Sequence, residues 1–352
     1  MGRQLSPVRG DDSFVRLTEP FRRELFVHCY RMLGSVDDAE ELVQEVYLRA
    51  WRSFDALEHR SAARAWLYRI ATNVCLTALG RPVRRMLPSG LGAPSDDPDA
   101  EPLLARGDVA WLEPIPDSLT RPESGDPAAI AASRASVRLA LIASLQHLPP
   151  RQRAVLILRE VLSFRAPEVA QMLGTSTPAI KSALQRARAR LDEVAPSPET
   201  LTEPDDPRAR ELLDQYMHAF EDSDPVALER VLRDDATLEM TPARTWFAGK
   251  RNCMRYIRRV MGPAGTWRMQ PLVANGQPAS AAYVRTDTGG YEPFAIVVLT
   301  TTERGIGRIA LFSDPRLFTR FAQPPSGSGG IAPTKPTLRA AASIASSGPP
   351  TR

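Results

Sequence analysis

The chain has 352 residues, three cysteines and a formal net charge of +4 at pH 7. Its length exceeds that of one ordinary domain and predicts two or three domains. The cysteines lie far apart and show no metal-binding or C-x-x-C spacing, so we expect no disulfide framework, no metal site and a reducing compartment. No apolar run reaches the roughly 18–20 residues that span a bilayer, and no signal peptide is evident. The sequence therefore predicts a cytoplasmic protein that does not enter a membrane.

After a flexible leader at residues 1–12, apolar residues recur at three- and four-residue steps through residues 13–80, which predicts a bundle of helices. In the helix that follows Ser35, acidic residues crowd the first turn, where they complement the helix dipole. One face of this helix carries Leu48 among charged side chains. Such a leucine indicates a docking surface, and a solvated face with one stray apolar residue is the alternative. The buried stripe is predicted to comprise Val43, Val46, Tyr47, Ala50, Trp51 and Phe54.

A further helix, from about Ala62 to Leu79, places Trp66, Arg69 and Asn73 on one side at helical spacing. These residue types offer a stacking surface, a phosphate partner and a base-edge partner, so this side is a candidate for binding nucleic acid. The alternative is that Trp66 is a core residue and that the other two side chains are solvated.

Residues 134–195 have the pattern of a helix-turn-helix. Pro149 and Pro150 fit the first turn of a helix, Gly174 ends the next and shorter helix, and Thr177 is expected to cap the one that follows. Basic residues greatly outnumber acidic ones here, which suits a polyanion. We expect the last helix to lie in the major groove of DNA, and a helical hairpin with a solvated basic face is the alternative.

Between these parts, residues 81–133 are rich in Pro, Gly, Asp and Ser and predict a flexible, acidic linker. Trp111, Leu112 and Ile115 form an apolar island in it, which we expect to dock either on a partner protein or on the C-terminal domain. A second linker is predicted at residues 196–207, and a disordered tail at residues 323–352.

Residues 208–322 predict an α+β domain in which helices come first and a curved antiparallel sheet follows. The helical patterns cover residues 208–223, 225–232 and 250–261. The strand patterns cover residues 236–240, 267–273, 279–285, 294–302 and 306–312.

The runs Asp38–Trp51, Trp66–Asn73 and Leu148–Arg153, with the helix-turn-helix, closely resemble sigma factors of the extracytoplasmic-function (ECF) group of the sigma-70 family. The resemblance implies a multidomain chain with two all-α sigma domains. Residues 13–80 would be region 2, a helical bundle that binds the clamp helices of the largest subunit of RNA polymerase and melts the −10 element. Residues 134–195 would be region 4, which binds the β flap and reads the −35 element.

Carried over position by position, the resemblance assigns residues to three surfaces. The core-polymerase-binding residues would be Glu41, Gln44, Glu45, Leu48 and Arg49. The −10 DNA-binding residues would be Trp66, Arg69 and Asn73. The −35 DNA-binding residues would be Ser176, Thr177, Lys181, Ser182, Gln185 and Arg186.

Residues 208–322, with the runs Trp246–Gly249 and Ala274–Ala279, resemble the SnoaL-like cone domain of actinobacterial sigma factors of the sigma-G and sigma-J types. Relatives of this fold include polyketide cyclases, and they suggest a small-molecule ligand of unknown identity. The acid–base candidates are His218, Glu239, Asp287 and Asp314. None has a partner at a diagnostic spacing, so we expect no catalytic residues, no enzymatic activity and no cofactor.

Together these features predict a sigma initiation factor that binds core RNA polymerase and promoter DNA, with the C-terminal domain regulating its activity in cis. The alternative is a free-standing helix-turn-helix transcription regulator with a ligand-sensing SnoaL-like domain. The run Asp38–Trp51 favours the first hypothesis, because a repressor has no need of a polymerase-docking helix.

Overall fold

The computed structural model describes residues 9–57, 59–80, 84–105, 107, 109–122, 126–194 and 201–321. The predicted tail, most of the predicted leader and residues 196–200 of the predicted second linker lie outside these residues. The chain divides into two units, which we describe separately. The helical unit comprises Met1–Arg85 and Ala140–Ala195, and the sheet-containing unit comprises Met86–Leu139 and Pro196–Arg352.

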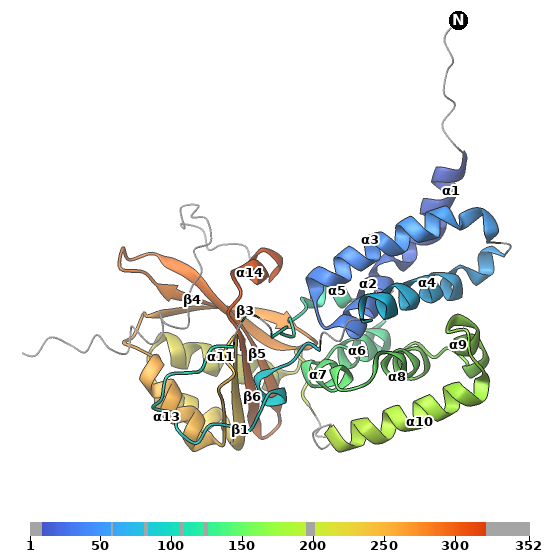
Figure 1. The fold of residues 1–352 in the computed structure, drawn as a ribbon. Helices are drawn as coiled ribbons and strands as arrows, with labels where there is room; N and C mark the ends of the chain where they lie inside the picture. Colours follow the sequence, from blue (N-terminus) through green and yellow to red (C-terminus); the bar gives the residue numbers. More distant parts are fainter. Residues whose placement is uncertain are drawn as a thin grey trace, which may run out of the picture. The chain divides into compact units, whose positions relative to one another are not determined.

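The first half of the helical unit is the expected bundle (Figure 1). Gly34 ends α2 with a positive φ of 72°, and the Ser35 hydroxyl accepts a hydrogen bond from the backbone N–H of Asp38 at 3.1 Å, which caps α3. The large side chains of Tyr30 and Tyr68 are fully buried between the helices. The helices are α1 (Arg9–Thr18), α2 (Arg22–Leu33), α3 (Val36–Arg52) and α4 (Ala63–Ala78), with 3-10 turns at Glu19–Phe21, Phe54–Ala56 and Arg60–Ala62.

One side chain of α3 lies differently from our expectation. Trp51 was predicted to belong to the buried stripe, but 43% of it is exposed. Phe14 of α1 is itself buried at this end of the bundle, where it makes edge-to-face contacts with both Trp51 and Phe54. The prediction was wrong. The apolar residue that packs on this end of α3 is Phe14 of α1, and the sequence pattern of α3 alone does not show this contact.

The second half of the helical unit contains the predicted helix-turn-helix. Gly174, with a φ of 60°, follows α9, and the turn leads directly into α10. The cap of α10 is Ser176, whose hydroxyl accepts from the N–H of Ala179 at 3.4 Å, so the prediction that Thr177 is the cap was off by one residue. The elements are α7 (Leu139–Gln146), α8 (Pro150–Leu156) with a π-helical turn at Ile157–Val161, α9 (Ala166–Met172) and α10 (Thr177–Val194).

The sheet-containing unit has one six-stranded sheet with the strand order β2-β1-β6-β5-β4-β3. The sheet is mixed, whereas we expected it to be antiparallel. β1 and β6 run parallel, and α13 and four further strands separate them along the chain, whereas the successive strands β3 to β6 pair as hairpins. The strands are β1 (Leu232–Thr241), β2 (Trp246–Ala248), β3 (Trp267–Ala274), β4 (Gln277–Arg285), β5 (Tyr291–Thr302) and β6 (Gly305–Phe312).

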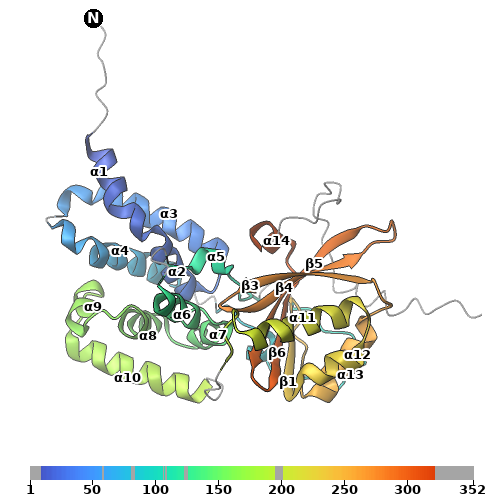
Figure 2. The same ribbon diagram turned by 180° about the vertical axis from the view of Figure 1, so that it is seen from behind.

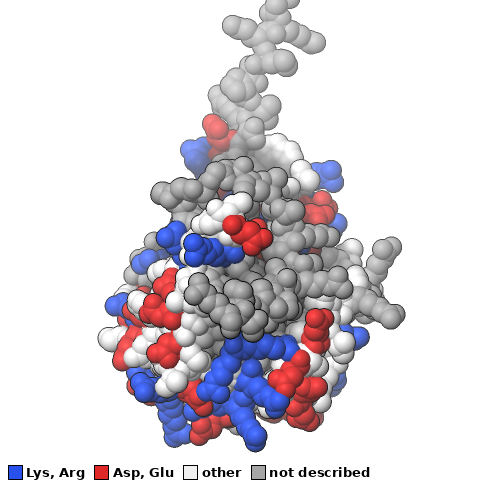
Figure 3. All heavy atoms as spheres, turned by 90° about the vertical axis from the view of Figure 1, so that its left-hand side faces the viewer, with Lys and Arg blue, Asp and Glu red and all other residues white. Residues whose placement is uncertain are grey.

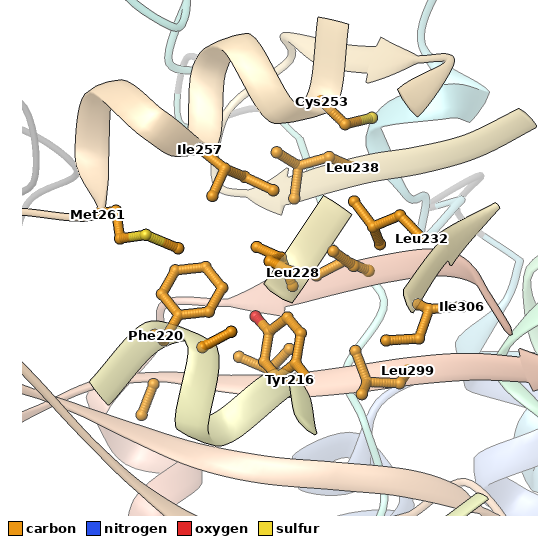
Figure 4. Packing of buried hydrophobic residues seen from close by; sticks show 14 of the residues in the cluster. Tyr216, Phe220, Leu228, Leu232, Leu238, Cys253, Ile257, Met261, Leu299 and Ile306 are labelled. Atoms are coloured by element: carbon orange, nitrogen blue, oxygen red, sulfur yellow. The ribbon is translucent and has the colours of Figure 1, made fainter. Parts of the chain in front are cut away.

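Helices pack against this sheet and enclose its core (Figure 2). The core includes Tyr216 and Phe220 of α11, Ile257 of α13 and Leu299 of β5 (Figure 4). The helices are α11 (Pro207–Glu221), α12 (Pro225–Val231), α13 (Lys250–Val260) and α14 (Pro315–Phe321). The segment before them adds a 3-10 turn at Pro88–Gly90, α5 (Asp117–Thr120) and α6 (Pro127–Ala135).

Candidate functional site

The predicted docking face of α3 is open to solvent. Glu41, Gln44 and Arg49 are exposed, and Arg49 pairs with Glu45 one turn away, with Nε and Oε1 2.6 Å apart. Leu48 is 52% exposed among these charges. Trp51 lies three residues further along the helix, on the same side as Leu48, and extends the apolar part of this surface. The spacing of three residues could have revealed Trp51 as a member of the face.

The three predicted nucleic-acid contacts on α4 are not equally accessible. Arg69 and Asn73 are exposed, whereas Trp66 is only 8% exposed, so its ring is not offered to a base in this arrangement. The Asn73 amide donates to the backbone carbonyl of Arg69 at 2.9 Å and to that of Met172 on α9 at 3.4 Å. Trp66 is therefore a buried residue in this structure, which agrees with the alternative interpretation of this helix.

The predicted reading head on α10 forms one exposed face. Ile180, Leu184 and Ala187 are buried on the opposite side, which anchors the helix in the unit. Arg186 donates to the Ser182 hydroxyl at 2.6 Å, so the guanidinium is held along the helix. The six predicted residues are all exposed except Thr177, which is half-buried. They are Ser176, Thr177, Lys181, Ser182, Gln185 and Arg186.

The helix-turn-helix packs on α2 and α4 within the helical unit. The ring of Phe164 lies 5.3 Å from that of Tyr68, and the guanidinium of Arg64 lies 4.6 Å above the Phe164 ring. Together with the bond from Asn73 to Met172, these contacts join a predicted DNA-binding helix to the element that precedes the reading head. The unit thus has a closed arrangement, in which α4 is partly covered.

A buried arginine contributes to this closed arrangement. Arg153 of α8 is 3% exposed and donates to the backbone carbonyls of Met32, Gln146 and Leu148 and to the side-chain oxygen of Gln146. Burial, together with nearby Arg84, lowers the pKa of Arg153 to about 10, so the guanidinium remains charged at neutral pH. Because Met32 lies in the last turn of α2, the arginine connects the two halves of the unit.

In the sheet-containing unit, the hairpin between β3 and β4 holds the segment of residues 86–139, hereafter the connecting segment. Asn275 is fully buried and has a φ of 55°, which suits asparagine in a tight turn. Its backbone N–H donates to the carbonyl of Ile115 at 2.9 Å, and its side-chain oxygen accepts from the N–H of Ile115 at 3.0 Å. Its amide group donates to the carbonyl of Val137 at 2.7 Å. One residue thus holds both ends of residues 115–137.

The neighbouring residues complete this clasp, which we define as Ala274–Gln277. The N–H of Gly276 donates to the Asp117 carboxylate at 2.7 Å, and the Gln277 side-chain oxygen accepts from the N–H of Leu139 at 3.0 Å. A Cβ on Gly276 would lie 2.7 Å from the Cβ of Arg134, so only glycine allows this approach. Burial raises the pKa of Asp117, although the Gly276 N–H and Arg134 oppose the rise.

Further contacts hold the connecting segment along the sheet, although composition predicted a flexible linker at residues 81–133. Leu112 and Ile115 of the apolar island are fully buried in this unit, so of the two docking partners we considered, the C-terminal domain is the one contacted. Two of its acidic residues pair with arginines: Asp117 pairs with Arg134, and Asp99 pairs with Arg255 of α13, whose Nε lies 3.1 Å from a carboxylate oxygen. Figure 3 shows basic side chains gathered on one face of this unit with acidic ones among them.

The four acid–base candidates do not form a common site. Glu239 is 1% exposed, accepts from the N–H of Ser89 at 2.9 Å and pairs with Arg308, so it holds the connecting segment. His218 and Asp287 are exposed, and Asp314 pairs with Arg316. Among the described residues, no group of three or more His, Cys, Asp or Glu side chains could hold a metal ion. No single described helix is long and apolar enough to cross a membrane, although the bent pair α6 and α7 meets these criteria jointly.

Comparison with known proteins relates these features to two sequence families. The model of sigma-70 region 2 matches residues 17–85, and that of sigma-70 region 4 matches residues 138–191. The ECF RNA polymerase sigma factor SigG of Mycobacterium tuberculosis is 47% identical over 329 residues, which cover 92% of this chain and 87% of that protein. SigJ of the same species is 26% identical over 325 residues, covering 87% and 95% of the two chains.

The structural comparison extends to the sheet-containing unit. The crystal structure of M. tuberculosis SigJ matches with a TM-score of 0.55 and 23% sequence identity, and the match covers 87% of this chain and 98% of that chain. This likeness shows the same fold, a helical sigma part followed by a domain with a sheet.

Proposed function

Since the chain belongs to the ECF RNA polymerase sigma factors, we propose that it binds core RNA polymerase and selects promoters through the three surfaces described above. The exposed face of α3, with Leu48 and Trp51 at its centre, would contact the clamp helices. The exposed face of α10 would read the −35 element. The observation that carries this proposal is the high identity to SigG over nearly the whole chain, together with a solvent-exposed apolar and charged face on α3.

We infer that engagement of the −10 element requires the helical unit to open. Trp66 is buried and Asn73 is bonded to α9, so a single strand cannot reach either side chain fully in the closed arrangement. Binding of α3 to polymerase and of α10 to DNA would supply the free energy to separate α4 from α9. A ligand shifts such an equilibrium only by its preference for one of the two states.

We also propose that the sheet-containing unit regulates initiation in cis by holding the connecting segment. The clasp binds residues 115, 117, 137 and 139, and Glu239 binds Ser89. The connecting segment joins the two predicted DNA-binding parts along the chain. A held segment therefore limits how far these parts can separate, and release of the clasp would lengthen their reach.

Enzymatic activity is not part of the proposed function. The four acid–base candidates do not form a common site, and Glu239 accepts a hydrogen bond from the backbone N–H of Ser89. We place the protein in the cytoplasm, because its proposed partner is RNA polymerase. The domain limits follow the predicted regions, with region 2 at residues 13–80, region 4 at 134–195 and the SnoaL-like domain at 208–322.

Run-off transcription with core RNA polymerase on candidate promoters tests the proposal. We expect transcripts that depend on both core and this protein, and their loss in the Leu48→Asp variant. The competing hypothesis, a free-standing helix-turn-helix regulator, predicts tight binding to promoter duplex without polymerase. Strong duplex binding together with no measurable affinity for core would refute the sigma assignment of α3.

A further inference from the structure

Helix α13 of the sheet-containing unit has an apolar side and a strongly basic side. Its 11 residues include five basic ones and no acidic one, so the charge is not balanced within the helix. Met254 and Ile257 are buried in the core of the unit, whereas the four arginines lie on the opposite side of the helix. They are Arg251, Arg255, Arg258 and Arg259. Figure 3 views the side on which Figure 1 draws α13, and basic side chains gather there.

Arg251, Arg255 and Arg258 form a line along this basic side, because residues three and four positions apart are neighbours on a helix. At a rise of about 1.5 Å per residue, the line is about 10 Å long. Duplex DNA carries one phosphate charge per roughly 1.7 Å of its axis, so a line of this length meets several phosphates. A guanidinium also matches the geometry of phosphate oxygens. The arginine line therefore suits the backbone of DNA.

A membrane with anionic lipids would also attract a line of arginines. Helices that lie on membranes combine a basic side with large apolar residues that enter the lipid. Within α13, all of which the structure describes, the exposed residues are Arg251, Arg255 and Arg258, and the apolar side is buried in the core. The helix therefore has the charge of a phosphate site without the apolar part of a membrane site.

The arginine line keeps unbalanced charge in the folded unit. Arg251 has no ion-pair or hydrogen-bond partner among the residues that the structure describes. Arg258 pairs with Glu229 of α12, and the two side chains are 50% and 45% exposed. Exposed ion pairs add little stability, because water screens them. A polyanion can therefore bind Arg251 directly and replace Glu229 at low cost.

An acidic stretch of the connecting segment lies beside α13. This acidic strap, which we define as residues 92–105, contains four acidic residues and no basic one. Its ends are fixed beside β2 and β1. The N–H of Ser95 donates to the carbonyl of Trp246 at 2.8 Å, and the N–H of Ala105 donates to that of Pro242 at 2.9 Å.

The middle of the acidic strap contacts two arginines of α13. The carboxylate of Asp99 pairs with Arg255, and Arg259 donates to the backbone carbonyls of Asp99 and Ala100. The Asp97 carboxylate accepts from the N–H groups of Asp99 and Ala100 and so fixes the turn that presents Asp99. Both partners of the pair between Asp99 and Arg255 are more than half exposed, so a polyanion can displace the carboxylate.

We propose that the basic side of α13 binds the phosphate backbone of duplex DNA without reading its sequence, and that the acidic strap competes with DNA for this surface. The proposal goes beyond the proposed function, which assigns the DNA contacts to the helical unit alone.

Fluorescence anisotropy of a labelled duplex of mixed sequence, titrated with full-length protein at several salt concentrations, tests the proposal. Each phosphate contact contributes about 0.9 to the slope of log K against log salt. Arg251→Ala should reduce the slope by this amount, which corresponds to about eightfold weaker binding at about 0.1 M salt if both proteins bind alike at about 1 M. Arg285→Ala is the matched control, because Arg285 is exposed at the end of β4. Equal affinity and slope in the two variants would overturn the proposal.

A second set of variants tests the acidic strap. Asp99→Asn should strengthen duplex binding about 2- to 5-fold, because Arg255 loses its competing carboxylate. Asp287→Asn causes the same change of net charge at an exposed site after β4 and is the matched control. The gain should disappear in the double variant Asp99→Asn/Arg255→Ala. Equal affinity of Asp99→Asn and Asp287→Asn would refute competition by the strap.

Vesicles of phosphatidylglycerol and phosphatidylcholine separate DNA from a membrane as the partner. Binding to these vesicles that depends on Arg251, together with an Arg251→Ala variant that binds the duplex as tightly as wild type, would overturn the proposal. The duplex contains no promoter and the assay contains no polymerase, so a negative result leaves the proposed function in place.

Discussion

Replacement of Asn275 by glycine tests whether the clasp holds the connecting segment. Glycine accepts the positive φ of this position, so the substitution removes the side chain without straining the turn. It leaves the N–H of Ile115 and the carbonyl of Val137 buried without their partners. Each orphaned group costs about 1–3 kcal/mol, so the clasp should weaken by about 2–6 kcal/mol. Asn275→Ala should weaken it further, by about 1–2 kcal/mol, because alanine resists a left-handed backbone.

Hydrogen–deuterium exchange of the full-length protein measures this loss. The reporter is the amide of Leu139, which is protected by the Gln277 side chain within the same clasp. A weakening of 2 kcal/mol corresponds to about 30-fold faster exchange, since about 1.4 kcal/mol is tenfold in an equilibrium constant. Asn252→Ala is the matched control, because Asn252 donates to the carbonyl of Ala248 and does not touch the connecting segment. Exchange of the Leu139 amide at the wild-type rate in Asn275→Gly would contradict this prediction. Equal acceleration in Asn275→Gly and in the control Asn252→Ala would also contradict it.

Three further predictions concern the helical unit. Leu48→Asp should abolish core binding without lowering the melting temperature, because the residue is 52% exposed; a lower melting temperature with normal core binding would contradict this. Lys181→Ala and Arg186→Ala should weaken promoter binding by the holoenzyme, by about 1–3 kcal/mol where a base edge is contacted, and unchanged affinity in both would place the reading face elsewhere. Arg153→Met should lower the free energy of unfolding in urea by at least about 3 kcal/mol, because several buried carbonyls lose a charged donor; a change below 1 kcal/mol would refute this role.

Local patterns predicted most of the elements. The helices of both sigma regions and strands β3 to β6 follow the apolar periodicity, and Gly34 and Gly174 mark the ends of α2 and α9. Capping and periodicity involve residues a few positions apart, so they can be read directly along the chain. β2 and α14 are short and were missed, since three to seven residues give no clear period.

Features that depend on distant residues could not be predicted in this way. The parallel pairing of β1 with β6 joins residues about seventy positions apart, and nothing in either strand specifies it. The contact of Trp51 with Phe14 joins two different helices. Composition indicated a flexible connecting segment, but Asp99 pairs with Arg255, and Ile115 of the apolar island is hydrogen-bonded to the clasp. The composition of a segment does not show which distant residues it contacts. Here those residues, Arg255 and Asn275, follow the segment by more than a hundred positions.

The clasp gives the proposed regulation a physical limit. Residues 85 and 140 belong to the helical unit, whereas the segment between them belongs to the sheet-containing unit. An extended chain spans at most about 3.3–3.6 Å per residue, so a free connecting segment would set a loose limit on the separation of the two halves of the helical unit. A segment fixed near residue 89 and from residue 115 to residue 139 loses most of that reach. The free energy of opening the helical unit therefore includes the cost of releasing or deforming these contacts. Because this cost is set inside the same chain, the proposed regulation in cis predicts that the threshold for initiation depends on the stability of the clasp.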